Sequence, residues 1–157
     1  MLENCCAFSG HRPGRFPWKH DETDSRCVAL KTVLTEQISA LIAADFTRFL
    51  TGMAEGTDCY CTQIVLNLRE KNPAIKLHCI IPYKGQADKQ SDVSRERYNS
   101  ILEQADSIVY VNRTYHKKCM LERNRFLVDH AAVLLAVWGG VSRSGTAATV
   151  RYAQKLG

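Results

Sequence analysis

The sequence lacks several features that define large classes of protein. Its longest apolar run, residues 131–138, is far shorter than the roughly 20 residues that a transmembrane helix needs. The first residues show no charged segment followed by an apolar core, so we expect no signal peptide. Lysine and arginine form no block, which argues against a nucleic-acid-binding surface. These absences favour a cytoplasmic protein that binds neither membranes nor nucleic acids.

Metal-binding cysteine motifs are also absent. The chain has seven cysteines, an odd number, and no CxxC pair. Cys59 and Cys61 stand at the start of a predicted helix, where residues two apart point to different faces. We therefore expect neither a zinc site nor a disulfide framework. Reduced cysteines that act as small core residues fit a cytoplasmic protein better.

The composition is that of an ordinary folded domain. Hydrophobic residues make up 45% and charged residues 24% of the 157 positions. A chain of this length buries most of its apolar surface in one core, so we predict a single domain over residues 1–157. The net charge of +5 is mildly basic, which suits a small anionic ligand.

Apolar runs alternate with segments of helical periodicity along the chain. Strands are predicted at residues 4–8, 45–50, 75–81, 107–111 and 131–138. Helices are predicted at residues 21–44, 59–71, 93–105, 120–130 and 147–156. Because every connection is long enough to be a helical crossover, we predict a three-layer α/β sandwich with a mainly parallel sheet of about five strands. The run 131–138 lacks alternation, which is typical of a central strand buried on both faces.

Glycine-containing loops follow the first, second and fifth predicted strands. In parallel sheets, ligands bind outside the carboxyl ends of the strands, so we expect these loops to meet at one site. The first loop contains Ser9, Gly10, His11 and Arg12. Gly10 would let the backbone approach a phosphate, and Arg12 would bind it. The alternative is a turn with an exposed histidine and arginine, and His11 has no identifiable carboxylate partner for general-base chemistry.

The second loop, residues 51–58, has the sequence TGMAEGTD. Its backbone and the start of the following helix would hold a phosphate, while Glu55 or Asp58 would accept a ribose hydroxyl. The alternative is that Thr57 or Asp58 is simply the N-cap of the helix.

The third loop lies between an apolar strand and a helix, which favours anion binding. It contains Gly139, Gly140, Gly145 and Thr146, and it matches neither the P-loop nor the dinucleotide fingerprint. Arg123 and Asn124, on the preceding helix, would reach the same edge of the sheet. The alternative is a solvated basic face that Arg123 and Arg125 share.

Aromatic and basic residues outside these loops have weaker signals. Trp18 and Tyr83 follow strand-end loops, and each either covers a ring of the ligand or packs in the protein. Arg95, Arg97 and Tyr98 are predicted to face solvent.

The motifs SGHRP at residues 9–13 and TGMAEGTD at residues 51–58, followed by the helix at 120–130, resemble those of the YpsA-like proteins of the SLOG superfamily. This superfamily includes the domain of DNA-processing protein A and the LOG phosphoribohydrolases. The resemblance covers nearly the whole chain. It implies a Rossmann-like fold that binds a nucleotide or nucleotide-derived ligand, such as NAD, ADP-ribose or a nucleoside monophosphate. We expect no further cofactor and no metal, and the resemblance is compatible with a homodimer.

The LOG hydrolases differ from this chain at their catalytic positions. They carry an Arg-Lys pair before the last strand and then Pro-Gly-Gly-x-Gly-Thr-x-x-Glu. Here Arg123 matches the arginine, Asn124 stands in place of the lysine, and Thr149 in place of the catalytic glutamate. Threonine can neither stabilise an oxocarbenium-like transition state nor act as a base toward water.

The comparison therefore favours a ligand-binding or sensing domain. An N-glycosidase in which Glu55 or Asp58 supplies the missing carboxylate is the alternative. The predicted ligand-binding residues are Ser9, Gly10, His11, Arg12, Gly52, Met53, Glu55, Gly56, Asp58, Arg123, Asn124, Gly139, Gly140, Gly145 and Thr146.

Overall fold

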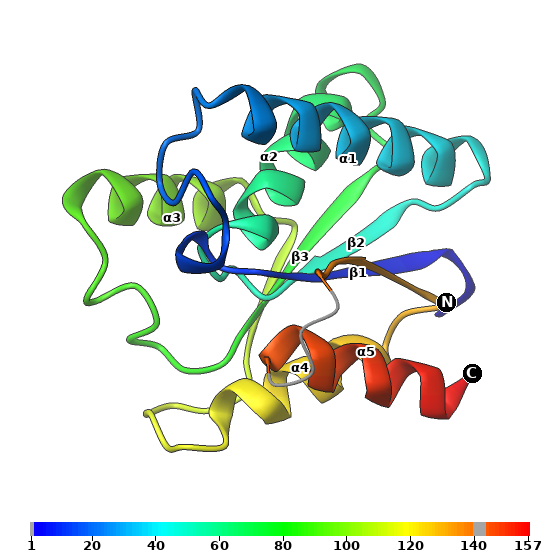
Figure 1. Cartoon of the computed structure of the whole chain (residues 1–157). Coiled ribbons are helices and arrows are strands. Elements are labelled where there is room, and N and C mark those ends of the chain that lie inside the picture. The colour runs from blue at the N-terminus through cyan, green and yellow to red at the C-terminus, as the bar shows by residue number, and fades with distance from the viewer. Residues whose placement is uncertain (1, 140–143) are drawn as a thin grey trace.

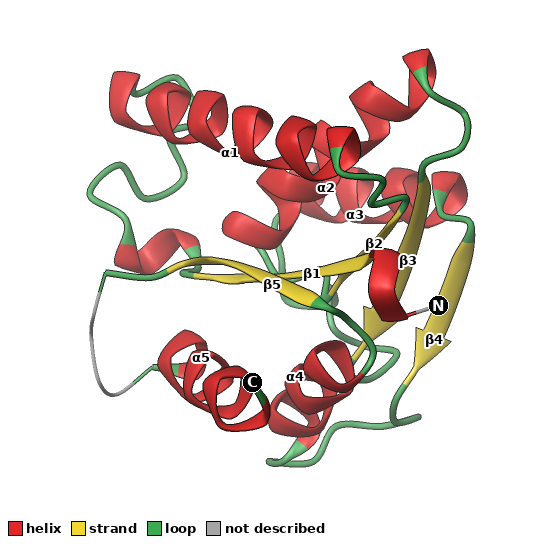
Figure 2. Ribbon diagram, turned by 90° about the vertical axis from the view of Figure 1, so that its right-hand side faces the viewer, coloured by secondary structure: helices red, strands yellow, loops and turns green. Residues whose placement is uncertain are grey.

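A parallel five-stranded sheet lies between two layers of helices (Figures 1 and 2). The structure is a computed structural model that describes residues 2–139 and 144–157. The strands are β1 (Cys5–Gly10), β2 (Arg48–Thr51), β3 (Lys76–Ile81), β4 (Ser107–Tyr110) and β5 (Val133–Val137). The helices are α1 (Ser25–Ala43), α2 (Thr57–Lys71), α3 (Asp92–Gln104), α4 (Cys119–Asp129) and α5 (Gly145–Leu156), with short 3-10 turns at Leu2–Asn4 and Pro13–Arg15. The three-layer, Rossmann-like α/β class predicted from the sequence is confirmed.

The order of the strands, β4-β3-β2-β1-β5, creates a topological switch at β1. The chain winds from β1 to β4 with α1, α2 and α3 on one face, then returns through α4 to place β5 on the other side of β1 (Figure 2). Ser9 pairs with Ala136 and Gly10 with Val137, so the loops after β1 and β5 leave the sheet side by side. The helices that follow, α1 and α5, lie on opposite faces of the sheet, an arrangement in which a crevice forms at the carboxyl ends of the strands.

Strand β5 is an edge strand, so the prediction that its apolar run is a central strand was wrong. All five of its residues are half-buried, because it has β1 as a neighbour on one side only. The centre of the sheet is β2, where Phe49 and Leu50 are buried. The run is apolar because helices pack on both faces of the sheet. It carries no information about the position of the strand within the sheet.

Several element boundaries differ from the predicted ones for local reasons. Helix α1 begins at Ser25 rather than at residue 21, because the side chain of Asp24 caps it by accepting a hydrogen bond from the backbone N–H of Arg26. Strand β2 begins at Arg48, because Asp45 has a left-handed φ of 69° and belongs to a turn. Among the described residues, no helix is both long and apolar enough to cross a membrane.

Side chains alternate between two cores on either side of the sheet. On β1, Cys6 and Phe8 enter the larger core under α1, α2 and α3, while Cys5 and Ala7 enter the smaller core that includes Leu127 of α4. Phe8 stacks on Phe49 with ring centroids 5.9 Å apart, which joins the two central strands at the base of the crevice. Both rings belong to the larger core.

We expect Phe8→Ala to lower the free energy of unfolding by about 3–5 kcal/mol, because it leaves a cavity in a fully buried site. Urea denaturation of the purified chain measures this change. The control is Val28→Ala on α1, whose side chain is 52% exposed and whose loss should change stability by about 0.5 kcal/mol or less. Similar losses for both variants would contradict the placement of Phe8 in the core.

Candidate functional site

The loop after β1 and the start of α2 are held together through one carbonyl group. The backbone N–H and the Oγ1 hydroxyl of Thr57 donate to the carbonyl oxygen of His11 at 3.2 and 3.0 Å. A Cβ on Gly10 would lie 2.4 Å from the Thr57 side chain, and one on Gly56, where φ is +85°, would lie 2.7 Å from the same carbonyl. Both glycines therefore permit close packing of the two loops, which is a different reason from the phosphate approach predicted for Gly10.

A cavity of about 240 Å³, here called the small cavity, opens at the carboxyl end of β1 and the start of α5. It brings together nine of the predicted site residues: Ser9, Gly10, His11, Arg12, Asp58, Arg123, Asn124, Gly145 and Thr146. Arg15 and Ser144 line it too, although sequence reasoning did not select them. The first and third loops and the helix before β5 therefore converge, as the strand-end argument predicts.

Arg123 places a buried guanidinium group at the small cavity. Its side chain is only 3% exposed, so the alternative of a solvated basic face shared with Arg125 is wrong for this residue. Nη1 donates to the carbonyl oxygen of Gly52, and Nε donates to Oδ1 of Asn124 at 2.8 Å. A Cβ on Gly52 would lie 2.4 Å from Nη1. Gly52 is thus a glycine because the guanidinium lies against it.

The carbonyl oxygen of Gly52 has a second donor that sequence reasoning missed. Nε2 of Gln86 donates to it at 2.9 Å, and Oε1 of Gln86 accepts from the hydroxyl of Tyr98 at 2.9 Å. Tyr98 is buried, which corrects the prediction that it faces solvent. Gln86 lies in a polar loop without periodicity, so no local pattern distinguished it from a solvated residue. The carbonyl oxygen of Gly52 thus accepts hydrogen bonds from Arg123 of α4 and from Gln86 of the loop after β3.

His11 is buried in a neutral form with one unpaired donor. Its Nε2 accepts a hydrogen bond from the backbone N–H of Gly139 at 3.0 Å, so the proton of the neutral ring is on Nδ1. Burial, assisted by the charge of Arg15, lowers the pKa of His11 below its ordinary value of 6.5. Within the described part of the chain, Nδ1 has no hydrogen-bond partner. The neutral ring therefore keeps one N–H donor without a partner among the described residues, while its acceptor nitrogen is already occupied.

Asp58 and Thr57 are not N-caps, since Gly56 occupies the N-cap position of α2. The Oδ2 atom of Asp58 accepts from the backbone N–H of Ala54 at 3.1 Å and so closes the loop before the helix. Burial raises the pKa of this carboxyl, while Arg123, the N–H of Ala54 and Arg12 oppose the shift. Asp58 thus closes the loop before α2 and also lines the small cavity.

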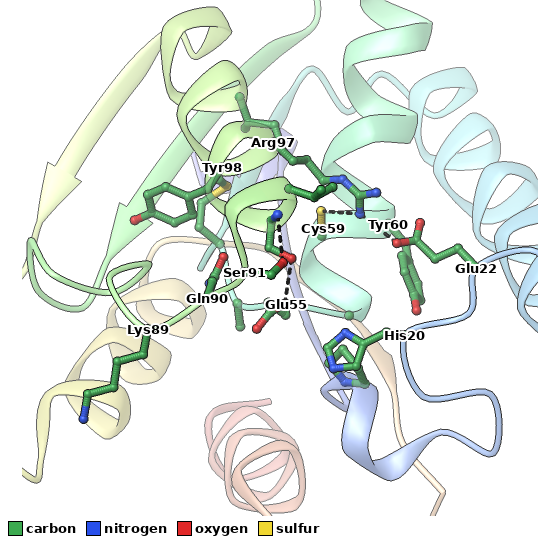
Figure 3. A pocket seen from close by; sticks show the side chains of 17 residues that line it. His20, Glu22, Glu55, Cys59, Tyr60, Lys89, Gln90, Ser91, Arg97 and Tyr98 are labelled. Carbon is green, nitrogen blue, oxygen red and sulfur yellow. Dashed lines mark hydrogen bonds and ion pairs between the residues drawn. The ribbon is translucent and has the colours of Figure 1, made fainter.

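A larger cavity of about 560 Å³ lies beside the small one and contains the other part of the second loop (Figure 3). Met53, Glu55 and Gly56 line this large cavity, and Ala54 lines both cavities. Oε2 of Glu55 accepts from the hydroxyl of Ser94 at 3.2 Å, which ties the loop to the start of α3. The second loop, predicted as one phosphate-binding unit, is therefore divided between two cavities.

Arg97 and Glu22 form an ion pair at the wall of the large cavity, with Nη1 and Oε2 2.7 Å apart. Oε1 of Glu22 also accepts from Lys31 at 2.7 Å. Burial acts to raise the pKa of Glu22, but the hydrogen bonds from Lys31 and Arg97 prevail and lower it. Arg97 also donates to the sulfur of Cys59 at 3.7 Å, as Figure 3 shows. Arg97 is thus committed to protein partners rather than solvated.

Three other residues considered from the sequence are held by contacts within the protein. Thr149 is buried in α5, where its hydroxyl donates to the carbonyl oxygen of Gly145 at 2.9 Å. Trp18 stacks on Phe16 at 4.5 Å, and Tyr83 packs edge-on against Tyr115 at 5.3 Å, so both make aromatic contacts within the protein. Gly140 lies outside the described residues.

We expect Gly52→Ala to lower the free energy of unfolding by about 1–3 kcal/mol, because the methyl group displaces a buried guanidinium from its acceptor. Chemical denaturation measures the change. Gly14→Ala is the matched control, since a Cβ there has nothing within 4 Å and should alter stability by about 0.5 kcal/mol or less. Equal effects of the two substitutions would argue against the contact between Gly52 and Arg123.

We expect the stability of the protein to fall as the pH decreases below about 6.5. Because the folded-state pKa of His11 is lowered, the unfolded chain binds more protons in this range, and acid favours unfolding. The His11→Gln variant should therefore lose less unfolding free energy than the original chain between pH 7.5 and pH 5. His78, whose pKa is also lowered, is present in both proteins and cancels in the difference. The control is His20→Gln, at an exposed histidine, which should keep the pH dependence of the original chain. If His11→Gln also keeps that pH dependence, the assignment of a neutral His11 ring is contradicted.

Comparison with known proteins places the chain among a group of bacterial relatives. The profile of the YspA SLOG family matches residues 6–155. The chain is 34% identical over 142 residues to the uncharacterized SPbeta prophage-derived protein YoqJ of Bacillus subtilis, covering 80% of this chain and 81% of that protein. It is 29% identical over 135 residues to a UPF0398 protein of Bacillus pumilus, covering 84% and 72% of the two chains. The sequence motifs, the fold and these matches agree, and the chain belongs to the YpsA family of SLOG proteins.

Proposed function

We propose that the chain is a binding or sensing module for a nucleotide or nucleotide-derived ligand of the NAD, ADP-ribose or nucleoside monophosphate type. The phosphate would occupy the small cavity at the carboxyl ends of the strands. The observation that carries the proposal is the buried guanidinium of Arg123 on the wall of this cavity. A hydrogen bond from a charged donor of this kind to a bound anion is worth about 1.5–3 kcal/mol.

Charge and helix geometry at the small cavity support the same assignment. Arg12 and Arg15 add two further guanidinium groups to its wall. Helix α5 begins there, with Gly145 and Thr146 on the wall and the hydroxyl of Ser144 capping the backbone N–H of Ala147 at 3.0 Å. The positive end of the helix dipole therefore faces the position proposed for the phosphate.

The state of the candidate carboxylates supports binding over hydrolysis. On α5, Thr149 occupies the position of a catalytic glutamate, and its hydroxyl is engaged within the helix. Glu55 lines the large cavity and accepts from Ser94. Asp58 lines the small cavity, but one of its oxygens is held by the N–H of Ala54. Of the two carboxylates proposed for an N-glycosidase, Asp58 is thus the one adjacent to the proposed phosphate.

A thermal-shift and calorimetric panel of AMP, NAD and ADP-ribose tests the proposal. A ligand at 100 times its Kd should stabilise the protein by about 2.7 kcal/mol. Arg123→Gln should weaken binding of that ligand by about tenfold or more, because a charged hydrogen bond is worth about 1.5–3 kcal/mol. Arg125→Gln, an exposed arginine on the same helix, is the matched control and should leave the affinity unchanged.

Arg12→Gln provides a second test variant, since Arg12 is exposed and lines the small cavity, so its loss is compatible with folding. It should also weaken binding. The proposal fails if no member of the panel stabilises the protein, or if Arg12→Gln, Arg123→Gln and Arg125→Gln bind the ligand equally well. Release of free base from AMP or NAD, abolished by Asp58→Asn or by Glu55→Gln, would instead establish the N-glycosidase.

We further propose that the protein acts in the cytoplasm. None of the seven cysteines, all within the described residues, forms a disulfide, a state that a reducing compartment maintains. Burial raises the pKa of the Cys6 and Cys79 thiols to about 12, which keeps both protonated and unreactive in the core.

A further inference from the structure

The two cavities differ in size in a way that bears on the ligand. Pockets that enclose a drug-sized molecule usually measure about 300–1,000 Å³. The small cavity, at about 240 Å³, lies below this range, and the large cavity, at about 560 Å³, lies within it. The small cavity therefore has room for a phosphate and the atoms next to it, but not for a whole nucleotide.

The cavities also differ in charge. The described wall of the small cavity has three guanidinium groups and one carboxyl group, that of Asp58. The described wall of the large cavity has two basic chains, Lys89 and Arg97, and two acidic ones, Glu22 and Glu55. Arg97 and Glu22 neutralise each other by direct pairing. An anionic group is thus favoured in the small cavity, and an uncharged group in the large one.

The wall of the large cavity suits a ring that carries hydroxyl groups. Met53, Tyr98 and Ile101 are buried and give it an apolar side against which a flat heterocycle can pack. Glu55 follows directly after Ala54, at the junction with the small cavity. Its carboxylate can accept hydrogen bonds from hydroxyl groups of a ligand there. Figure 3 shows Tyr98 beside α3 and Glu55 below that helix.

The two cavities meet at one residue. Ala54 lines both of them, and the consecutive residues Arg12 and Pro13 line the small and the large cavity, respectively. A molecule that passes over Ala54 can therefore occupy both cavities at once, with its hydroxyl-bearing part next to Glu55 and its anionic part next to Arg123.

We propose that the large cavity is the nucleoside subsite, in which the base and ribose of the ligand bind while its phosphate lies in the small cavity. The inference rests on the proposed function, because it takes the small cavity as the phosphate site. The positions of the strand-end loops predicted one site, and the large cavity is a second one next to it. The inference also makes Val93, Glu55 and Tyr98 determinants of selectivity for the nucleoside part.

Calorimetric titrations of the full chain with inorganic phosphate, adenosine and AMP test this division. AMP should bind about tenfold or more tightly than phosphate or adenosine, because one linked molecule fills both cavities. Val93→Trp, at a rim residue that is 70% exposed, should reduce the AMP affinity to within about threefold of the phosphate affinity and leave the phosphate affinity intact. Val28→Trp, at an exposed valine on α1, is the matched control and should change neither affinity.

Glu55→Gln is a second variant that preserves the shape of the cavity, and it should also weaken AMP binding but not phosphate binding. If AMP binds the original chain, Val93→Trp and Glu55→Gln equally well, the nucleoside lies elsewhere and the inference is overturned. If neither phosphate nor AMP binds the original chain, it is the proposed function that fails. The phosphate and AMP titrations of the original chain distinguish the two failures.

Discussion

The carbonyl oxygen of Gly52 is the acceptor on which the geometry of the site depends. A guanidinium removed from water is strongly destabilising unless its N–H groups find acceptors, and this carbonyl accepts from Arg123. Gln86 donates to the same oxygen and is itself held by Tyr98. The end of β2, the loop after β3, α3 and α4 are thereby joined at one atom, and the buried charge is presented to the small cavity in a single orientation.

A second constraint acts at the topological switch between β1 and β5. The carbonyl oxygen of His11 accepts both donors of Thr57, while its imidazole accepts the N–H of Gly139. One residue thus connects the loops that leave β1 and β5 with the start of α2. Nε2 is thereby occupied, and Nδ1 keeps the proton of the neutral ring without a partner among the described residues. The contacts that hold the loops together also fix the position of the His11 ring.

Much of the fold and part of the site follow from local patterns. Alternating apolar runs and helical periods predict the parallel sheet, and the position of SGHRP at the end of β1 predicts that Ser9 and Arg12 lie at the ligand edge. Gln86 was not predictable, because its partner Gly52 lies 34 residues away and its own surroundings have no periodicity. The interpretation of Gly10 as an opening for a phosphate reflects the same limit. A glycine shows in the sequence that space is needed, but not which atom fills it.

The sequence by itself determined the strands, the helices and the loops that meet at the carboxyl ends, since periodicity and strand ends are properties of neighbouring residues. Only the tertiary structure decided that β5 is an edge strand and that the second loop is shared between two cavities. It also placed Arg123 against Gly52, 71 residues away along the chain. These outcomes depend on which buried donors find acceptors and which side chains fill the same space. Both are settled when distant segments pack together.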